Sequence, residues 1–108
     1  MPIGIGLYGL NGHQIADLLV NNPRVRLVAI CGIDRDHLPE SLRAEPDLAM
    51  AANRDELLAD PRVDLVSLCS PRRRDQAQDA VRALRAGKHV YAEKPCAMTE
   101  ADLDRIMA

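Results

Sequence analysis

The chain has 108 residues, which suits one small domain and leaves no room for a second, since domains usually run to about 100–150 residues. Its 47% hydrophobic and 28% charged residues are ordinary for a globular protein, and no stretch approaches the ~20 apolar residues of a membrane helix. The formal net charge of −2, from 14 basic and 16 acidic residues, excludes a general attraction of the chain to nucleic acid or anionic lipid.

The cysteines and the amino terminus point to a reducing compartment. Cys31, Cys69 and Cys96 are odd in number, lie far apart and fall in apolar or strand-like runs, which argues against a disulfide framework. No Cys or His spacing is typical of a zinc site, so no bound metal is expected. The amino terminus has neither the charged start nor the cleavage site of a secretion signal. We therefore expect free thiols and a cytoplasmic protein.

The first half of the chain alternates short apolar runs with amphipathic or polar segments. Apolar runs bounded by glycine or proline are typical of buried strands, whereas Ile15, Leu18 and Leu19 share one face of a helix. Pro23 ends that helix, and Pro39 weakens the next one. In chain order, these patterns predict a strand at residues 3–8, a helix at 12–22, a strand at 25–31 and a weak helix at 36–45.

The second half shows the same alternation with clearer helix starts. Asn53, followed by Glu56 three residues later, is typical of a capped helix, and Thr99 with Asp102 repeats that spacing. In chain order, this half predicts a strand at 48–51, a helix at 53–59, a strand at 63–69, a helix at 75–86 with Ala77, Ala80, Val81 and Leu84 on one face, a strand at 89–92 and a helix from Thr99 to the end of the chain.

Strands that alternate with helices through short connections imply a parallel sheet with helices on both faces. The sequence therefore predicts a single doubly wound α/β domain over residues 1–108. Ligands of such domains bind where the carboxyl ends of the strands meet. Candidate functional residues are those that follow the predicted strands.

The first strand is followed by the loop Gly9-Leu10-Asn11-Gly12-His13-Gln14, at the place where a dinucleotide fold has its phosphate loop. Of the glycines in the usual GxGxxG pattern only the first is kept, because Asn11 and Gln14 stand at the second and third positions. Backbone N–H groups and a helix start would still favour a phosphate there. The alternative is a glycine turn that binds nothing.

The end of the second strand carries charges that could contact a ribose. Gly32 lies where a ribose-binding acid is usual, and Asp34 and Arg35 follow it. An acid suits the ribose hydroxyl of NAD, whereas an arginine suits the 2′-phosphate of NADP. A solvated helix start would carry the same charges without binding anything.

Two further segments follow predicted strands. Ser70-Pro71-Arg72-Arg73-Arg74-Asp75 comes after the fourth strand, where the arginines either meet an anion or form a solvated basic run. Glu93-Lys94-Pro95 ends the fifth strand, at the edge where a crevice would place reacting groups, although Lys-Pro turns at strand ends are common.

Two stretches resemble the amino-terminal domain of the Gfo/Idh/MocA oxidoreductase family, named for glucose-fructose oxidoreductase and inositol dehydrogenase. Residues 86–95, AGKHVYAEKP, are similar to the family signature AGKHVxxEKP. Residues 63–71, VDLVSLCSP, are similar to its VDxVxIxTP strand and loop. The resemblance covers nearly the whole chain and implies a Rossmann fold with strand order 3-2-1-4-5.

The departures from the family pattern concern the cofactor. Where the family usually reads TPNxxH, Arg72 and Asp75 stand at the Asn and His positions. Gly32 replaces the acid of many members, which leaves NAD or NADP open as the cofactor. Family members also carry a carboxy-terminal substrate domain and a sixth strand, for which this sequence has no residues.

The resemblance implies a domain that binds NAD or NADP in an oxidoreductase acting on a sugar- or cyclitol-like hydroxyl. It places the cofactor against Gly9 to Gln14, Asp34 or Arg35, Ser70-Pro71-Arg72 and Glu93-Lys94-Pro95, with Lys94 as the catalytic residue. The alternative is a non-catalytic nucleotide-binding or interaction module, and we expect no turnover by these 108 residues alone. The open edge of the fifth strand predicts self-association.

Overall fold

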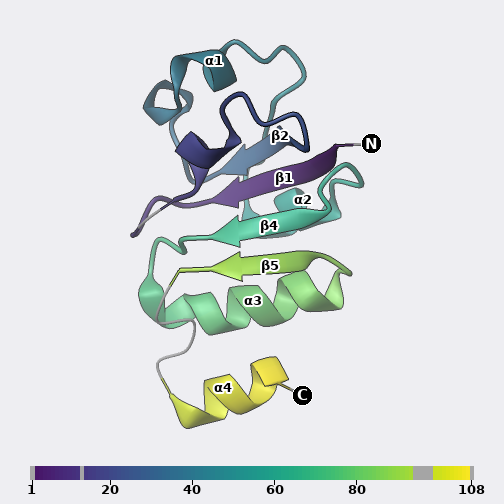
Figure 1. Ribbon diagram of the computed structural model, residues 1–108. Coiled ribbons are helices and arrows are strands. Elements are labelled where there is room, and N and C mark those ends of the chain that lie inside the picture. Colours follow the sequence, from purple (N-terminus) through teal and green to yellow (C-terminus); the bar gives the residue numbers. More distant parts are fainter. Residues whose placement is uncertain (1, 13, 94–98, 108) are drawn as a thin grey trace.

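Five parallel strands form one sheet in the order β3-β2-β1-β4-β5 (Figure 1), which confirms the predicted doubly wound α/β fold. The computed structural model describes residues 2–12, 14–93 and 99–107. The strands are β1 Ile3–Tyr8, β2 Val25–Cys31, β3 Ala49–Met50, β4 Leu65–Leu68 and β5 His89–Ala92. The helices are α1 Glu40–Arg43, α2 Arg54–Ala59, α3 Gln76–Arg85 and α4 Glu100–Met107, with 3₁₀ turns at Ala16–Leu19, Arg35–His37 and Arg73–Asp75.

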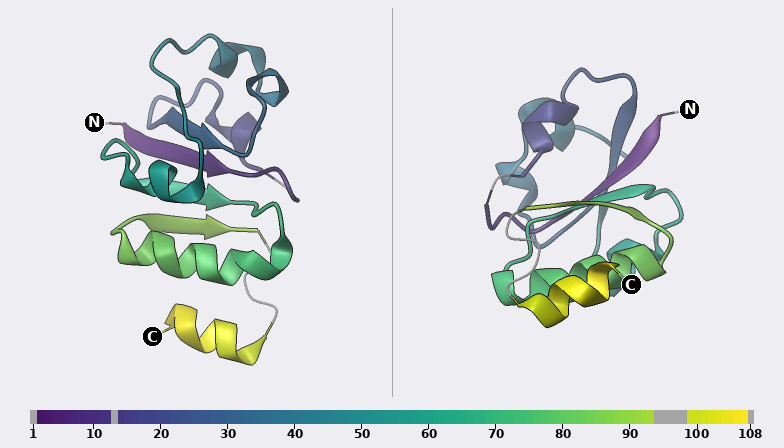
Figure 2. Two further views of the ribbon diagram at one scale, coloured as in Figure 1. Left: turned by 180° about the vertical axis from the view of Figure 1, so that it is seen from behind. Right: turned by 60° about the horizontal axis from the view of Figure 1, so that its bottom comes forward.

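The two faces of the sheet are covered differently. On one face α2 and α3 cover a buried cluster that includes Leu57, Val66 and Ala80, and Ile106 of α4 packs against this cluster. On the other face, the 3₁₀ turn Ala16–Leu19 and the segment around α1 cover a second cluster. Figure 2 shows α3 and α4 on one side of the sheet and α1 on the other. Side chains alternate between the two faces along β1 and β4, whereas the consecutive residues Val28 and Ala29 of β2 both join the first cluster, beside an irregularity in the pairing with β1.

Helix α3 lies on the sheet through alanines, and this corrects the expected buried face. Ala77, Ala80 and Ala83 are buried, whereas Leu84, which the spacing placed on the same helical face as Ala77 and Ala80, is 46% exposed. Small side chains let the helix approach the sheet closely, so the alanines lie innermost. Helix α2 begins as predicted, because the Asn53 side chain accepts a hydrogen bond of 2.8 Å from the Glu56 N–H.

The first half of the chain is less helical than its sequence pattern predicts. The helix expected at 12–22 is only a 3₁₀ turn, after which Asn21 adopts a positive φ of 56°. The helix expected at 36–45 is split into a 3₁₀ turn and α1, because Pro39 restricts Leu38 to an extended backbone with ψ of 153°. The strands expected at 48–51 and 63–69 are shorter, at Ala49–Met50 and Leu65–Leu68.

Two cysteines contribute to the interior. Cys31 and Cys69 are buried and form no disulfide among the described residues, while Cys96 lies outside them. Burial raises the pKa of the Cys31 thiol, and the negative charges of Glu56 and Asp79 add to the increase. Among the helices that the structure describes, none is both long and apolar enough to cross a membrane.

Candidate functional site

The carboxyl ends of β1, β2 and β4 converge on three residues that are far apart in the sequence. Gly9 has φ of 75°, and a Cβ there would lie 2.1 Å from the carbonyl oxygen of Cys69, so only glycine fits. A Cβ on Gly32 would lie 3.7 Å from the Gly9 Cα and 3.8 Å from the Pro71 Cγ. Gly9, Gly32 and Pro71 therefore approach one another at one edge of the sheet, where the sequence predicted a ligand site.

The loop after β1 keeps some backbone donors free. The Asn11 N–H donates to the Cys69 carbonyl at 3.2 Å, and the Asn11 Nδ2 donates to the Pro71 carbonyl at 3.4 Å, which ties the loop to the end of β4. The N–H groups of Leu10 and Gly12 have no acceptor within the described part of the chain. His13 lies outside the described residues. These amides can bind an anion, but the following turn is too short to add the expected helix dipole.

Gln14 turns inward under this loop. Its Nε2 donates to the Gly9 carbonyl at 3.0 Å, and its Oε1 accepts from the Ser67 hydroxyl at 2.6 Å and from the Ile15 N–H at 2.9 Å. Gln14 is among the residues predicted to bind the cofactor, and in the structure its amide holds the loop on the sheet. Ser67, which sequence analysis missed, is its buried partner. The available signal was a lone polar residue inside an apolar strand.

The side chains of Asp34 and Arg35, the two charged residues after β2, have different partners. The Asp34 side chain is exposed and accepts from the Asp36 N–H at 3.0 Å, which caps the short turn behind it. The Arg35 guanidinium donates to the carbonyls of Arg43 at 3.0 Å and Glu45 at 2.7 Å. Arg35 is thus fastened to the end of α1, whereas the Asp34 carboxylate faces solvent.

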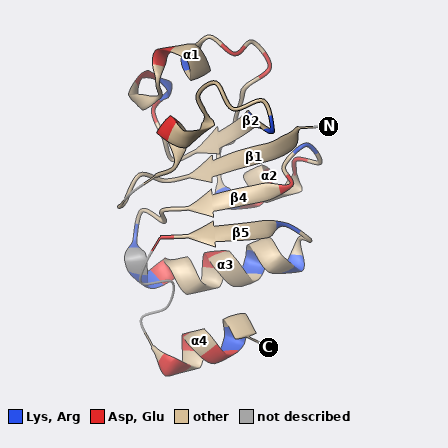
Figure 3. Ribbon diagram, in the orientation of Figure 1, with Lys and Arg blue, Asp and Glu red and all other residues tan. Residues whose placement is uncertain are grey.

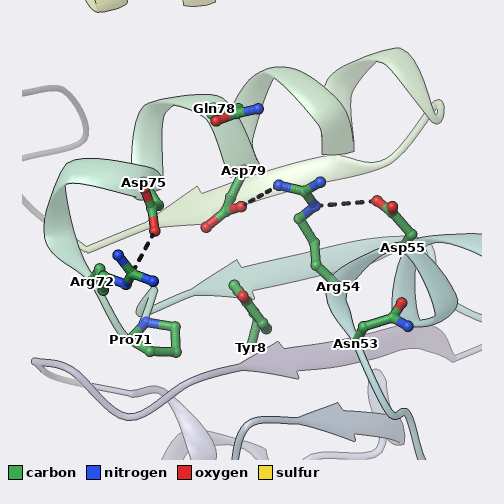
Figure 4. A pocket seen from close by; sticks show the side chains of 9 residues that line it. All are labelled: Tyr8, Asn53, Arg54, Asp55, Pro71, Arg72, Asp75, Gln78 and Asp79. Carbon is green, nitrogen blue, oxygen red and sulfur yellow. Dashed lines mark hydrogen bonds and ion pairs between the residues drawn. The ribbon is translucent and has the colours of Figure 1, made fainter.

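A cavity of about 430 Å³ opens beside Pro71, between the starts of α2 and α3 (Figure 4). Arg54 and Asp79 face each other in it at 2.7 Å, although Asp79 is only 2% exposed. Burial raises the pKa of the Tyr8 phenol, and the Asp79 charge raises it further. Sequence analysis did not predict that Tyr8, Arg54 and Asp79 come together here. The cavity is lined by Tyr8, Asn53, Arg54, Asp55, Pro71, Arg72, Asp75, Gln78 and Asp79.

The basic run lies at the turn from β4 into α3 (Figure 3). The Arg72 side chain is 68% exposed and its Nε lies 3.8 Å from an Asp75 carboxylate oxygen, so the two residues at the altered family positions face each other. Ser70, in contrast, is fully buried. The exposed Arg72 side chain can therefore either contact an anion or remain solvated.

The end of β5 lies beside that turn. The Glu93 N–H donates to the Leu68 carbonyl at 2.9 Å, and the Glu93 carbonyl accepts from the Gln76 side chain. Lys94 and Pro95 lie outside the described residues, so their roles stay predictions. Within the described residues, no group of three or more His, Cys, Asp and Glu side chains is placed to hold a metal ion.

A parallel sheet whose switch point carries a glycine loop, free backbone amides and an acid after the second strand defines the class of dinucleotide-binding domains. The family comparison narrows this class. Residues 3–108 match the model of the Gfo/Idh/MocA family, described as an oxidoreductase family with an NAD-binding Rossmann fold. The chain belongs to this family.

Relatives of known activity differ in their substrates. The chain is 32% identical over 107 residues to the myo-inositol 2-dehydrogenase of Thermotoga maritima and 31% identical over 107 residues to the 4-carboxy-2-hydroxymuconate-6-semialdehyde dehydrogenase of a Sphingobium strain. These matches cover 99% of this chain and 32% and 34% of those proteins, respectively.

A solved structure supports the same relationship. The 3-ketoreductase KijD10 of Actinomadura kijaniata, solved with NADP, matches 99% of this chain and 34% of its own, at 29% identity and a TM-score of 0.74. The chain thus spans about a third of the length of the relatives it matches.

Proposed function

We propose that this chain forms the cofactor-binding part of an enzyme that transfers a hydride between a nicotinamide cofactor and a hydroxyl-bearing carbon of a sugar- or cyclitol-like substrate. The observation that carries the proposal is the approach of Gly9, Gly32 and Pro71 at the switch point of the sheet. Membership of an NAD-binding oxidoreductase family supports it. The inositol dehydrogenase among the relatives supports the substrate class.

The described residues fit a dinucleotide. At Gly9 the missing Cβ lets the loop lie against β4, and the N–H groups of Leu10 and Gly12 would meet the pyrophosphate. Ser70, Pro71 and Arg72 would flank the cofactor on the side of β4. Gln14 would act through the loop, because its side chain is occupied by Gly9 and Ser67.

The cofactor proposal is NAD in preference to NADP. The exposed Asp34 carboxylate would accept from a ribose hydroxyl and would repel a 2′-phosphate. Arg35, the cation that could attract that phosphate, already donates to two backbone carbonyls. One relative was solved with NADP, so this preference belongs to the particular arrangement of Asp34 and Arg35 in this chain.

The catalytic proposal concerns Lys94, on the basis of the matched EKP segment. The cofactor, when bound, supplies the hydride acceptor or donor. Lys94 would polarise the substrate hydroxyl and relay its proton as the hydride leaves the same carbon. In a form that includes the substrate-binding part, Lys94→Ala should lower kcat by about 10²–10⁴ while cofactor affinity is nearly kept. A variant that retains most of its kcat would refute this role.

A non-catalytic nucleotide-binding module is the second candidate. The pairing of Arg72 with Asp75, at positions where the family usually has Asn and His, favours it. The two candidates differ in whether a longer form turns over substrate. A longer form that binds NADH without catalytic activity would support the second candidate. We expect no turnover from the 108 residues alone, because catalysis needs the substrate held against the cofactor and the chain spans only about a third of the length of its relatives.

Calorimetric titration of the chain with NADH and NADPH tests the binding proposal. We expect NADH to bind more tightly, and Asp34→Ala to weaken NADH and narrow the difference between the two cofactors. Asp36→Ala is the matched control, because this exposed neighbour contributes only its backbone N–H to the Asp34 cap. Absence of binding of either cofactor at about 1 mM would overturn the proposal. An unchanged preference in Asp34→Ala would remove Asp34 from it.

A further inference from the structure

Two polar side chains on the inner face of α3 hold the segment that follows β4. Gln76 is fully buried and its Oε1 accepts from the Ser70 N–H at 3.0 Å. One turn further along, the Asp79 Oδ2 accepts from the Ser70 hydroxyl at 2.6 Å. Ser70 immediately precedes Pro71, which lies against Gly9 and Gly32. Both the backbone and the side chain of Ser70 are therefore fixed from one helix.

The same two side chains reach beyond Ser70 in opposite directions. The Asp79 Oδ1 accepts from Arg54, the first residue of α2 (Figure 4). The Gln76 Nε2 donates to the Glu93 carbonyl just after β5. The chain of contacts Arg54–Asp79–Ser70–Gln76–Glu93, which we call the α3 brace, thus connects two helices with the carboxyl ends of two neighbouring strands.

The α3 brace is more specific than helix packing requires. Ala77, Ala80 and Ala83 already bury this face of α3 against the sheet. Hydrogen bonds add direction, since they hold an acceptor or donor at one distance and one angle. No buried side-chain polar atom of the described residues lacks a partner, so any displacement of Ser70 or Glu93 would leave a buried group unsatisfied.

We propose that Gln76 and Asp79 are positioning residues for the cofactor site: both hold Ser70, and Gln76 also holds the backbone just after β5. Asp79 holds the Ser70–Pro71 turn against the phosphate loop, and so acts on the adenosine and pyrophosphate half. Gln76 holds the Glu93 carbonyl as well as the Ser70 N–H, and so also fixes the segment just after β5, on the side proposed for the nicotinamide. This inference rests on the proposed binding of a nicotinamide dinucleotide.

ADP-ribose separates the two halves, because it is the cofactor without its nicotinamide. Dissociation constants for NADH and ADP-ribose are measured by calorimetry on the wild-type chain, Gln76→Met and Asp79→Asn, well below their unfolding temperatures. Gln76→Met should weaken NADH about tenfold more than ADP-ribose, and Asp79→Asn should weaken both ligands about tenfold, the order expected for a lost hydrogen bond. If Gln76→Met does not fold, Gln76→Glu keeps the acceptor for Ser70 and tests the same difference.

Val63→Ala is the matched control for stability. Val63 is 1% exposed and lies before β4, at the end of the sheet away from the site, so its truncation destabilises the core without touching the α3 brace. Val63→Ala should leave both dissociation constants unchanged. An equal loss in this control, or NADH binding by Gln76→Met that matches the wild type, would overturn the positioning roles. If the wild-type chain binds neither ligand, the proposed function itself fails and the inference fails with it.

Discussion

The two faces of the sheet show different ways of fixing a segment. On the face of α2 and α3, regular helices lie on apolar side chains, Ala77, Ala80 and Ala83 bring α3 close to the sheet, and the α3 brace adds hydrogen bonds to this packing. On the other face the first connection is only a 3₁₀ turn, and single polar side chains hold the loop in place. The difference teaches that the candidate phosphate loop depends on a few specific contacts. Single substitutions should therefore disturb the loop more than its surface position suggests.

The largest expected effect is a loss of stability on substitution of Gly9, compared with Gly87, which has a similar positive φ. Gly9→Ala should cost about 4 kcal/mol or more, because the new Cβ would lie 2.1 Å from the Cys69 carbonyl oxygen in addition to the strain of φ 75°. Gly87→Ala is the control, since φ is 81° there but no atom lies within 4 Å of the added Cβ. It should cost about 1–2 kcal/mol. Denaturant unfolding measures both values, and equal costs would show that the contact with β4 is unimportant.

A smaller effect tests how Gln14 holds the loop. Gln14→Ala should cost about 1–3 kcal/mol, because the Gly9 carbonyl loses a donor and the buried Ser67 hydroxyl loses its acceptor. Gln14→Ala combined with Ser67→Ala should cost less than the sum of the single variants, by about 0.5–3 kcal/mol. Gln78→Ala, an exposed position on α3, should stay within about 0.5 kcal/mol of the wild type. Strict additivity of the Gln14 and Ser67 variants would mean that the two side chains act separately.

The smallest effect concerns the edge of the sheet. β5 is the last strand in the order, and its Tyr91 side chain is 56% exposed on the face that lacks α3. Unpaired backbone groups along such an edge favour association with a second chain, although a strand of four residues limits the effect. Sedimentation should show a mass that rises with concentration, and Tyr91→Lys should reduce that rise. A monomer at every concentration would contradict the expectation.

Local sequence patterns predicted the fold because the residues that form those patterns also determine where the strands and helices lie. The apolar runs became β1, β2 and β5 with the predicted bounds, and Asn53 capped α2 as its spacing to Glu56 indicated. The prediction of a helix at 12–22 was wrong. The spacing of apolar residues gives a helical period, but it does not reveal that the Gln14 side chain turns inward to Ser67. Pro39 weakens the predicted helix at 36–45, as expected, and by restricting Leu38 it splits that segment into a 3₁₀ turn and α1.

The candidate site was predictable only in part. Strand ends are local features, so the segments at Gly9, Asp34, Ser70 and Glu93 could be named in advance. The pairing of Arg54 with Asp79 spans 25 positions, and nothing in the spacing of either residue indicates the other. Partners at such distances are set by how α2 and α3 come together on the sheet, which a single sequence does not reveal.

The attachment of Arg35 to the end of α1 has a consequence for how such a domain could change its cofactor. Loss of the Asp34 carboxylate would remove a repulsion, but the guanidinium would still be engaged by the carbonyls of Arg43 and Glu45. Under the proposed preference for NAD, a change to NADP would therefore need a second event that frees Arg35 and leaves those carbonyls to find other donors. Under the proposed roles of Asp34 and Arg35, cofactor choice would be coupled to the integrity of a neighbouring helix end, because freeing Arg35 removes a donor from two carbonyls there.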